Sequence, residues 1–173
     1  MMTKLTGLLA AAALAFSSLP AVAEIEIHHA YARASGAMAN AGAAFMGIMN
    51  TGDADDRLIG ASTDAAKKAE LHTHKDNGDG VMQMMHVPEG FVIPAGGGHH
   101  LARGGDHVMM MGLTRAFVQG ETIMLTLVFE HAGEITIEVV IDNERAADDM
   151  GDHAGHEGHM DHSSHGEGMG HGN

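Results

Sequence analysis

The 173-residue chain has no cysteine, and only nine lysines and arginines stand against 23 acidic residues. Without cysteine, disulfides cannot hold the fold together, and both thiolate metal sites and cysteine nucleophiles are excluded. The formal net charge of −14 disfavours contact with nucleic acids and anionic membrane surfaces, because like charges repel. We therefore expect neither as a partner.

The chain also lacks the apolar run of about 20 residues that crosses a bilayer as a helix. Its apolar run over residues 5–16 follows Lys4 and precedes Ala21-Val22-Ala23, a pattern typical of a secretory signal peptide. We predict a signal peptide over residues 1–23, cleaved after Ala23, and a periplasmic protein that inserts in no membrane after cleavage. An uncleaved anchor is the alternative.

Methionine and histidine are abundant, with 15 of each. The composition changes near Asn143, where apolar and β-branched residues give way to Gly, His, Asp and Glu. We predict one folded domain over residues 24–142 and a His/Met-rich tail over residues 143–173. With so few apolar side chains, the tail is expected to be disordered without metal. Its predicted ligands, which suit Cu(II), are His153, His156, His159, Met160, His162, His165, Met169 and His171.

Short runs of strand-forming residues, separated by Gly/Asn/Asp turns, recur through the predicted domain and favour an all-β sandwich or barrel. Residues 122–129 and 134–141 alternate apolar and polar side chains across a four-residue turn and predict a hairpin. A single helical turn over residues 63–70 is an alternative in that stretch. The other expected strands are 24–33, 43–50, 57–62, 69–73, 81–87 and 107–112.

The segment from His72 to Met111 is richest in donors for a soft metal. Alternation in its strands places His107 and Met109 on one face and Met85 and Met110 on the other. Thioether sulfur favours Cu(I) over harder ions, and neutral imidazole joins it. Other methionines have an ordinary explanation, because methionine fills gaps in cores; we assign Met46, Met49 and Met124 to the core. The roles of four further histidines stay open: His74, His86, His99 and His100.

In these residues the chain resembles the periplasmic copper chaperones called PCu(A)C, the DUF461 family. The resemblance covers nearly all of residues 24–141 and is carried by AELH at 69–72, GVMQM at 80–84, IPAGG at 93–97 and GGDHVMMMGL at 104–113. It implies a cupredoxin-like β-sandwich in which four residues coordinate Cu(I): His72, Met84, His107 and Met109. The gap between Met84 and His107 is one residue longer than in the family, so Met82 or Met85 is an alternative to Met84.

The resemblance further implies copper delivery to the copper subunit of cytochrome oxidase, alongside a Sco-type protein. A storage, detoxification or general metal-buffering protein is the alternative. We do not expect an enzyme, since a blue-copper site needs a cysteine thiolate and no hydrolase, phosphate-loop or metalloprotease motif occurs.

Overall fold

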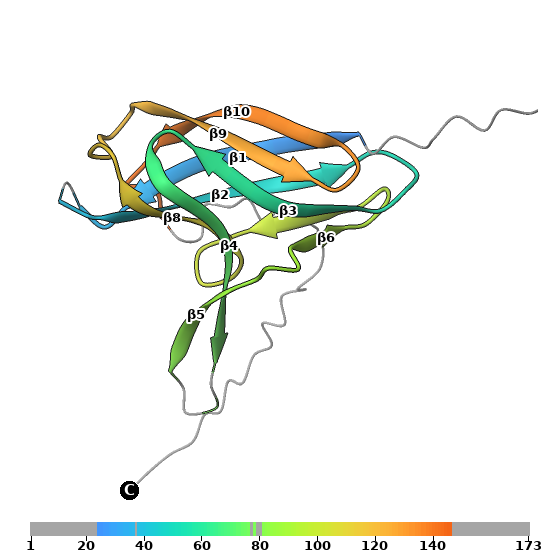
Figure 1. Ribbon diagram of the computed structural model, residues 1–173, viewed down its shortest axis with the longest axis horizontal. Coiled ribbons are helices and arrows are strands. Elements are labelled where there is room, and N and C mark those ends of the chain that lie inside the picture. Colours follow the sequence, from blue (N-terminus) through green and yellow to red (C-terminus); the bar gives the residue numbers. More distant parts are fainter. Residues whose placement is uncertain (1–23, 37, 77, 79–80, 147–173) are drawn as a thin grey trace, which may run out of the picture.

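The computed structural model describes residues 24–36, 38–76, 78 and 81–146. The predicted signal peptide and all the predicted tail ligands lie outside the described residues. Within them the chain forms ten strands and no helix (Figure 1). The strands are β1 (Ile25–Ala34), β2 (Ala41–Asn50), β3 (Asp56–Thr63), β4 (Ala66–Asp76), β5 (Met82–His86), β6 (Phe91–Ile93), β7 (Gly98–Leu101), β8 (His107–Leu113), β9 (Thr122–Phe129) and β10 (Gly133–Ile141).

The strands form one sheet in the order β5-β4-β8-β2-β1-β10-β9-β3-β6, with β7 paired to β2 beside β8. All pairings are antiparallel except that of β1 with β10. The inward side chains of the central strands meet in a single buried cluster that includes Met46, Val108, Met110, Leu125 and Leu127. The predicted all-β, cupredoxin-like sandwich is therefore confirmed.

The expected hairpin at the C-terminal end is present, since β9 pairs with β10 along its full length. The alternative helical turn over residues 63–70 is wrong: β3 runs to Thr63 and β4 begins at Ala66, with only a two-residue turn between them. Strands β6 and β7 were not expected. They have three and four residues, and such short runs give little periodic signal.

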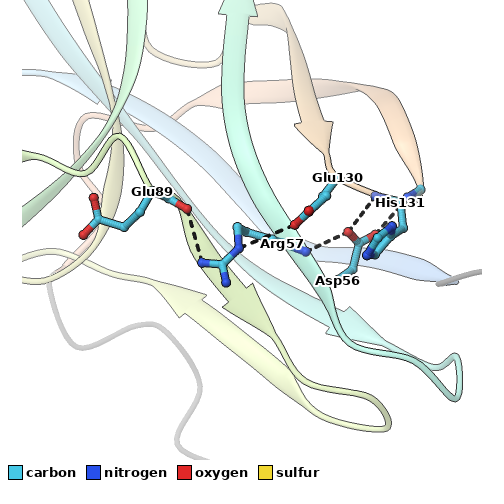
Figure 2. Close-up of polar contacts among 6 residues, drawn as sticks. Asp56, Arg57, Glu89, Glu130 and His131 are labelled. Atoms are coloured by element: carbon cyan, nitrogen blue, oxygen red, sulfur yellow. Dashed lines mark hydrogen bonds and ion pairs between the residues drawn. The ribbon is translucent and has the colours of Figure 1, made fainter.

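A buried carboxylate ties β3 to the β9–β10 turn (Figure 2). Asp56 is 2 % exposed, and its side chain accepts hydrogen bonds from the backbone N–H groups of Arg57, His131 and Ala132 at 2.7–2.9 Å. The Arg57 guanidinium contacts the Glu130 carboxylate and donates to the Glu89 carbonyl. His131 is exposed and takes part through its backbone N–H.

One part of the sheet leaves the body of the molecule. The far end of β4 and all of β5 form an arm that projects from the sandwich (Figure 1). Every residue of β5 is exposed. The arm therefore carries its side chains beside the sandwich rather than in its core.

Candidate metal centre

Pairing of β4 with β8 and β5 brings the predicted donors together. His72 lies opposite His107 on one side and His86 on the other, and His74 lies opposite Met84. Directly paired residues project from the same face of a sheet. This face also carries Met109, opposite Glu70. We call the set of His72, His74, Met84, His107 and Met109 the first donor cluster.

A cavity of about 400 Å³ opens on this face. Four members of the cluster line it: His74, Met84, His107 and Met109. His72 lies next to them, with its ring centroid 6.0 Å from that of His107. The structure thus places three of the four predicted ligands in the cavity and the fourth beside it. His74, whose role the sequence left open, lines the cavity because it is two residues from His72 on the same strand face.

The orientation of His107 is fixed. Its side chain is 1 % exposed, and its Nδ1–H donates to the Gly105 carbonyl at 2.9 Å. A carbonyl only accepts, so in the neutral ring the proton sits on Nδ1 and Nε2 keeps a free lone pair. Burial lowers the pKa of His107 below its ordinary value of 6.5, which keeps the ring neutral. The His74 Nδ1–H reaches the same carbonyl at 3.3 Å.

His72 has an unusual polar environment. Its Nε2 lies 3.2 Å from Oε2 of Glu70, whereas its buried Nδ1 has no hydrogen-bond partner in the described part of the chain. Buried polar atoms are rarely left unpaired, because desolvation without a partner costs about 1–3 kcal/mol. A neutral ring that donates from Nε2 to Glu70 leaves Nδ1 as an unused acceptor. A metal ion is one partner that such a nitrogen accepts.

Glu70 supplies a fixed negative charge beside the cluster. Hydrogen bonds from Lys68 and then His72 hold the pKa of Glu70 below its ordinary value of 4.5. A carboxylate that accepts from a ligating imidazole orients that ring and raises its basicity. Glu70 thus has the placement of a supporting residue for His72.

The register also separates the three β5 methionines. Met84 is paired with His74, whereas Met85 is paired with Thr73 and so projects from the opposite face. Met82 is paired with Asp76, two pairs further out along the arm than Met84. No group of three or more His, Cys, Asp or Glu side chains is placed to hold a metal ion anywhere in the described ranges. A site with three or more protein ligands on this face would therefore include a methionine sulfur.

The remaining candidates have mixed outcomes. His86 stands beside His72, with ring centroids 5.7 Å apart. His99 stacks on Phe91 and bonds Asp106 at 2.9 Å, away from the cavity. Met46 is buried as expected, but the assignment of Met49 and Met124 to the core is wrong, because these side chains are 39 % and 48 % exposed. Both lie on the outward side of their strands, where the alternation of β2 and β9 places them.

Two arginines at the cavity, Arg33 and Arg103, were not identified from the sequence. Arg33 comes from β1 and Arg103 from the loop between β7 and β8. No local pattern marks either residue, since only the folded sheet brings these segments to the donor face.

Known structures share this arrangement of strands. The copper-bound PCuAC domain from PmoF2 is 27 % identical, with 71 % of this chain and 96 % of that domain covered at a TM-score of 0.58. The solution structure of CuI-DR1885 from Deinococcus radiodurans is 30 % identical, with 76 % of this chain and 84 % of that one covered at a TM-score of 0.56. The expected likeness to PCu(A)C domains is thus found in three dimensions.

Sequence comparisons give a family. A putative lipoprotein, Lxx21020, of Leifsonia xyli subsp. xyli (strain CTCB07) is 34 % identical over 126 residues, which cover 72 % of this chain and 74 % of that protein. No helix long and apolar enough to cross a membrane occurs among the residues that the structure describes. The family model described as putative lipoprotein LpqE-like matches residues 25–141. The chain therefore belongs to the LpqE-like family.

Proposed function

We propose that the protein is a periplasmic copper chaperone and not an enzyme. It binds Cu(I) through Met84, His107, Met109 and His72 and passes the ion to a copper enzyme. The observation that carries this proposal is the convergence of the Met84 and Met109 thioethers and the His107 imidazole, whose Nε2 keeps a free lone pair, on one cavity, with the unpartnered Nδ1 of His72 beside it. This donor set is soft and uncharged, which suits a monovalent copper ion and disfavours Zn²⁺, Mg²⁺ and Ca²⁺.

The solved relatives support the choice of ion. One is named as copper-bound and another as a Cu(I) form. The resident residues fit the same cargo, because the buried His72 Nδ1 lacks a partner and His107 presents a free Nε2. Imidazole must be neutral to bind, and the lowered pKa of His107 meets that condition.

Release requires an accessible site. Met84 is 47 % exposed on the projecting arm, so an incoming ligand can replace it first while His107 still holds the ion. Arg33 and Arg103 lie at the cavity of a chain whose net charge is −14. They favour docking of an acidic surface around the site. The family resemblance supports the copper subunit of cytochrome oxidase as the recipient in this proposal, with a Sco-type protein acting alongside.

The terminal segments complete the proposal. Residues 1–23 direct export, residues 24–142 form the copper-binding domain, and residues 143–173 capture Cu(II) through their histidines. The first tail residues remain tied to the sandwich: Asn143 accepts from the Ala34 N–H at 3.0 Å and donates to the Phe117 carbonyl at 2.9 Å. The imidazole-rich remainder suits Cu(II), which binds nitrogen donors more strongly than other divalent first-row ions do.

The proposal is tested with a Met84→Ile/Met109→Ile double variant. A competing Cu(I) chelator measures Cu(I) affinity, and X-ray absorption detects copper–sulfur scattering. We expect Cu(I) affinity to fall by at least about a hundredfold, near 3 kcal/mol, while Cu(II) uptake stays unchanged. A Met124→Ile variant is the control, since Met124 is an exposed methionine outside the cluster. Unchanged Cu(I) affinity in the double variant would show that the site lies elsewhere.

Separate His72→Gln and His74→Gln variants decide which imidazole completes the site. We expect the larger loss of Cu(I) affinity from His72→Gln, because the Nδ1 of His72 has no other partner. The alternative of a storage or buffering protein predicts a different stoichiometry. Several ions of similar affinity, most of them lost on deletion of residues 147–173, would favour buffering over delivery of a single ion.

A further inference from the structure

A second group of histidine and methionine side chains lies on β1, β2 and β7. His28 is paired with Gly47, and Gly47 is paired in turn with His100 on its other side. Met49, two residues along β2, is paired with Glu26 and Gly98. Paired residues share a face, so His28, His100, Met49 and Glu26 all project from one side of the sheet. We call His28, Met49 and His100 the second donor cluster.

This arrangement repeats that of the first donor cluster. There, β4 carries Glu70 and His72, with Met109 opposite the glutamate and His107 opposite the histidine. Here, β1 carries Glu26 and His28, with Met49 opposite the glutamate. In both, a glutamate oxygen lies beside Nε2 of the histidine two residues on, at 3.2 Å for Glu70 and 3.3 Å for Glu26. In the second cluster Gly47 lies opposite His28, and His100 lies on the other side of Gly47.

Gly47 leaves the space that two imidazoles need. A Cβ built on it would lie 3.5 Å from His100 Nδ1 and 3.8 Å from the His28 Cβ. Any larger side chain would therefore extend into the space between the side chains of His28 and His100. Neighbouring strands are about 4.8 Å apart, so the backbones of His28 and His100 are separated by about 10 Å, a span that two imidazoles can bridge around one ion. A cavity of about 240 Å³ opens here, and all three members of the cluster line it.

A β-bulge adds a further imidazole to the cavity. The register between β1 and β2 shifts between His28 and Tyr31, and His29 has a positive φ of 53°. This left-handed conformation costs a non-glycine residue about 1 kcal/mol. Bulges re-aim side chains and are frequent beside functional sites. Here the bulge places His29 in the lining next to His28, with ring centroids 6.5 Å apart.

We propose that His28, His100 and Met49 form a second Cu(I) site, separate from the first. Two imidazoles and a thioether are the donor types of the first donor cluster, and they favour copper over harder ions. The Glu26 carboxylate beside His28 favours a bound cation. Nothing in the proposed chaperone function requires this site, so the two can fail independently.

The two clusters lie beside different positions along β2. Met109 of the first is paired with Ala43, and His28 of the second is paired with Gly47, four residues along β2. That separation is about 13 Å along the strand. Between them Phe45 and Tyr31 pack together, with ring centroids 5.1 Å apart and side chains almost fully buried. One ion therefore cannot be shared by both clusters.

The test follows each methionine separately by NMR of the full chain carrying ¹³C-methyl methionine, as Cu(I) is added without oxygen. Methionine-to-isoleucine variants assign the signals. We expect the Met84 and Met109 methyl signals to move first and the Met49 signal to move on further addition. In a His28→Gln/His100→Gln variant, the Cu(I) concentration that moves Met49 should rise about tenfold or more, with the Met84 and Met109 signals unaffected. His131→Gln, an exposed histidine in the β9–β10 turn, is the matched control.

Both histidines are exposed, so the double variant is expected to fold. A Met49 signal that stays in place after the Met84 and Met109 signals have stopped moving would overturn the second site. So would a Met49 signal that responds equally in the double variant. Failure of Met84 and Met109 to respond would instead contradict the proposed chaperone site.

Discussion

The two donor clusters differ in how firmly their side chains are held. In the first, His107 is 1 % exposed and donates a hydrogen bond to the Gly105 carbonyl, which also accepts one from His74. In the second, the His28 side chain is 50 % exposed, and its ion-pair partner among the described residues is the exposed Glu26. The difference arises from the loop that joins β7 to β8, which carries Gly105 to the rings of the first cluster.

Similar donors therefore need not bind Cu(I) equally well. Side chains already held in their binding geometry lose less conformational entropy when the ion arrives. We therefore expect the first donor cluster to bind Cu(I) more tightly than the second. In both clusters, strand alternation places one residue in the core and the next residue on the donor face. Substitutions at two adjacent residues can therefore affect stability and Cu(I) binding separately.

We expect the greatest difference between substitutions at the adjacent residues Met110 and Met109. Met110 is fully buried, so Met110→Ala should lower the free energy of unfolding by about 2–5 kcal/mol. Met109 lines the cavity, so Met109→Ala should cost much less stability but weaken Cu(I) binding. Urea unfolding and a Cu(I) competition assay measure the two effects. Equal losses of stability would show that Met109 is a packing residue.

The same alternation explains how far the sequence predicts the molecule. It assigns His107 and Met109 to one face and Met110 to the other, as the structure has them, because β8 is regular and flanked by clear turns. The assignment of Met49 to the core failed because it rested on the general use of methionine in cores and not on alternation, which places Met49 on the face opposite to the buried Ile48. The second donor cluster was missed for the same reason, and because β7, which brings His100, is only four residues long.

The pairing of distant segments is the other feature that local sequence patterns do not predict. The cavity beside Met84 includes Arg33 and Arg103, which come from β1 and the β7–β8 loop. Their approach depends on the sheet order, and β1 has β2 and β10 as neighbours for reasons of global packing. Local propensities carry no information about such an order.

Two glycines of β2 give the next largest contrast. A Cβ on Gly42 would lie 2.9 Å from the Arg33 carbonyl oxygen and 2.9 Å from Cε2 of Phe117. Gly42→Ala should therefore lower the free energy of unfolding by about 1–3 kcal/mol. Gly47→Ala meets nothing nearer than 3.5 Å and should change stability by less than about 0.5 kcal/mol. Thermal or urea unfolding of both variants measures this, and equal effects would contradict the difference in space.

A bulkier substitution at Gly47 tests the second cluster without replacing any of its proposed ligands. Gly47→Val should fill the gap between His28 and His100 and weaken Cu(I) binding there by about tenfold, or 1.4 kcal/mol. Stability should hold or rise by up to about 1 kcal/mol, since valine suits a strand better than glycine does. The Met49 methyl signal reports the binding and urea unfolding reports the stability. Unchanged copper response at Met49 would mean that the imidazoles do not meet over Gly47.

We expect the smallest change in stability from the ionisation of Tyr31, the only tyrosine of the chain. Tyr31 packs on Phe45 between the two clusters. Burial raises the pKa of Tyr31 above its ordinary value of 10.0, although the nearby Arg145 opposes the shift. In this pH range the folded state keeps a proton that the unfolded chain has lost. The contribution of Tyr31 to stability is therefore intact below pH 10 and declines as the pH rises toward the folded-state pKa. Tyrosinate absorbance of the folded protein should titrate at higher pH than that of the urea-unfolded chain. In Tyr31→Phe the loss of stability at alkaline pH should be smaller. Coincident titration curves of the folded and unfolded chains would show that solvent reaches the Tyr31 ring. In that case the two clusters would not be separated by a dry aromatic pair.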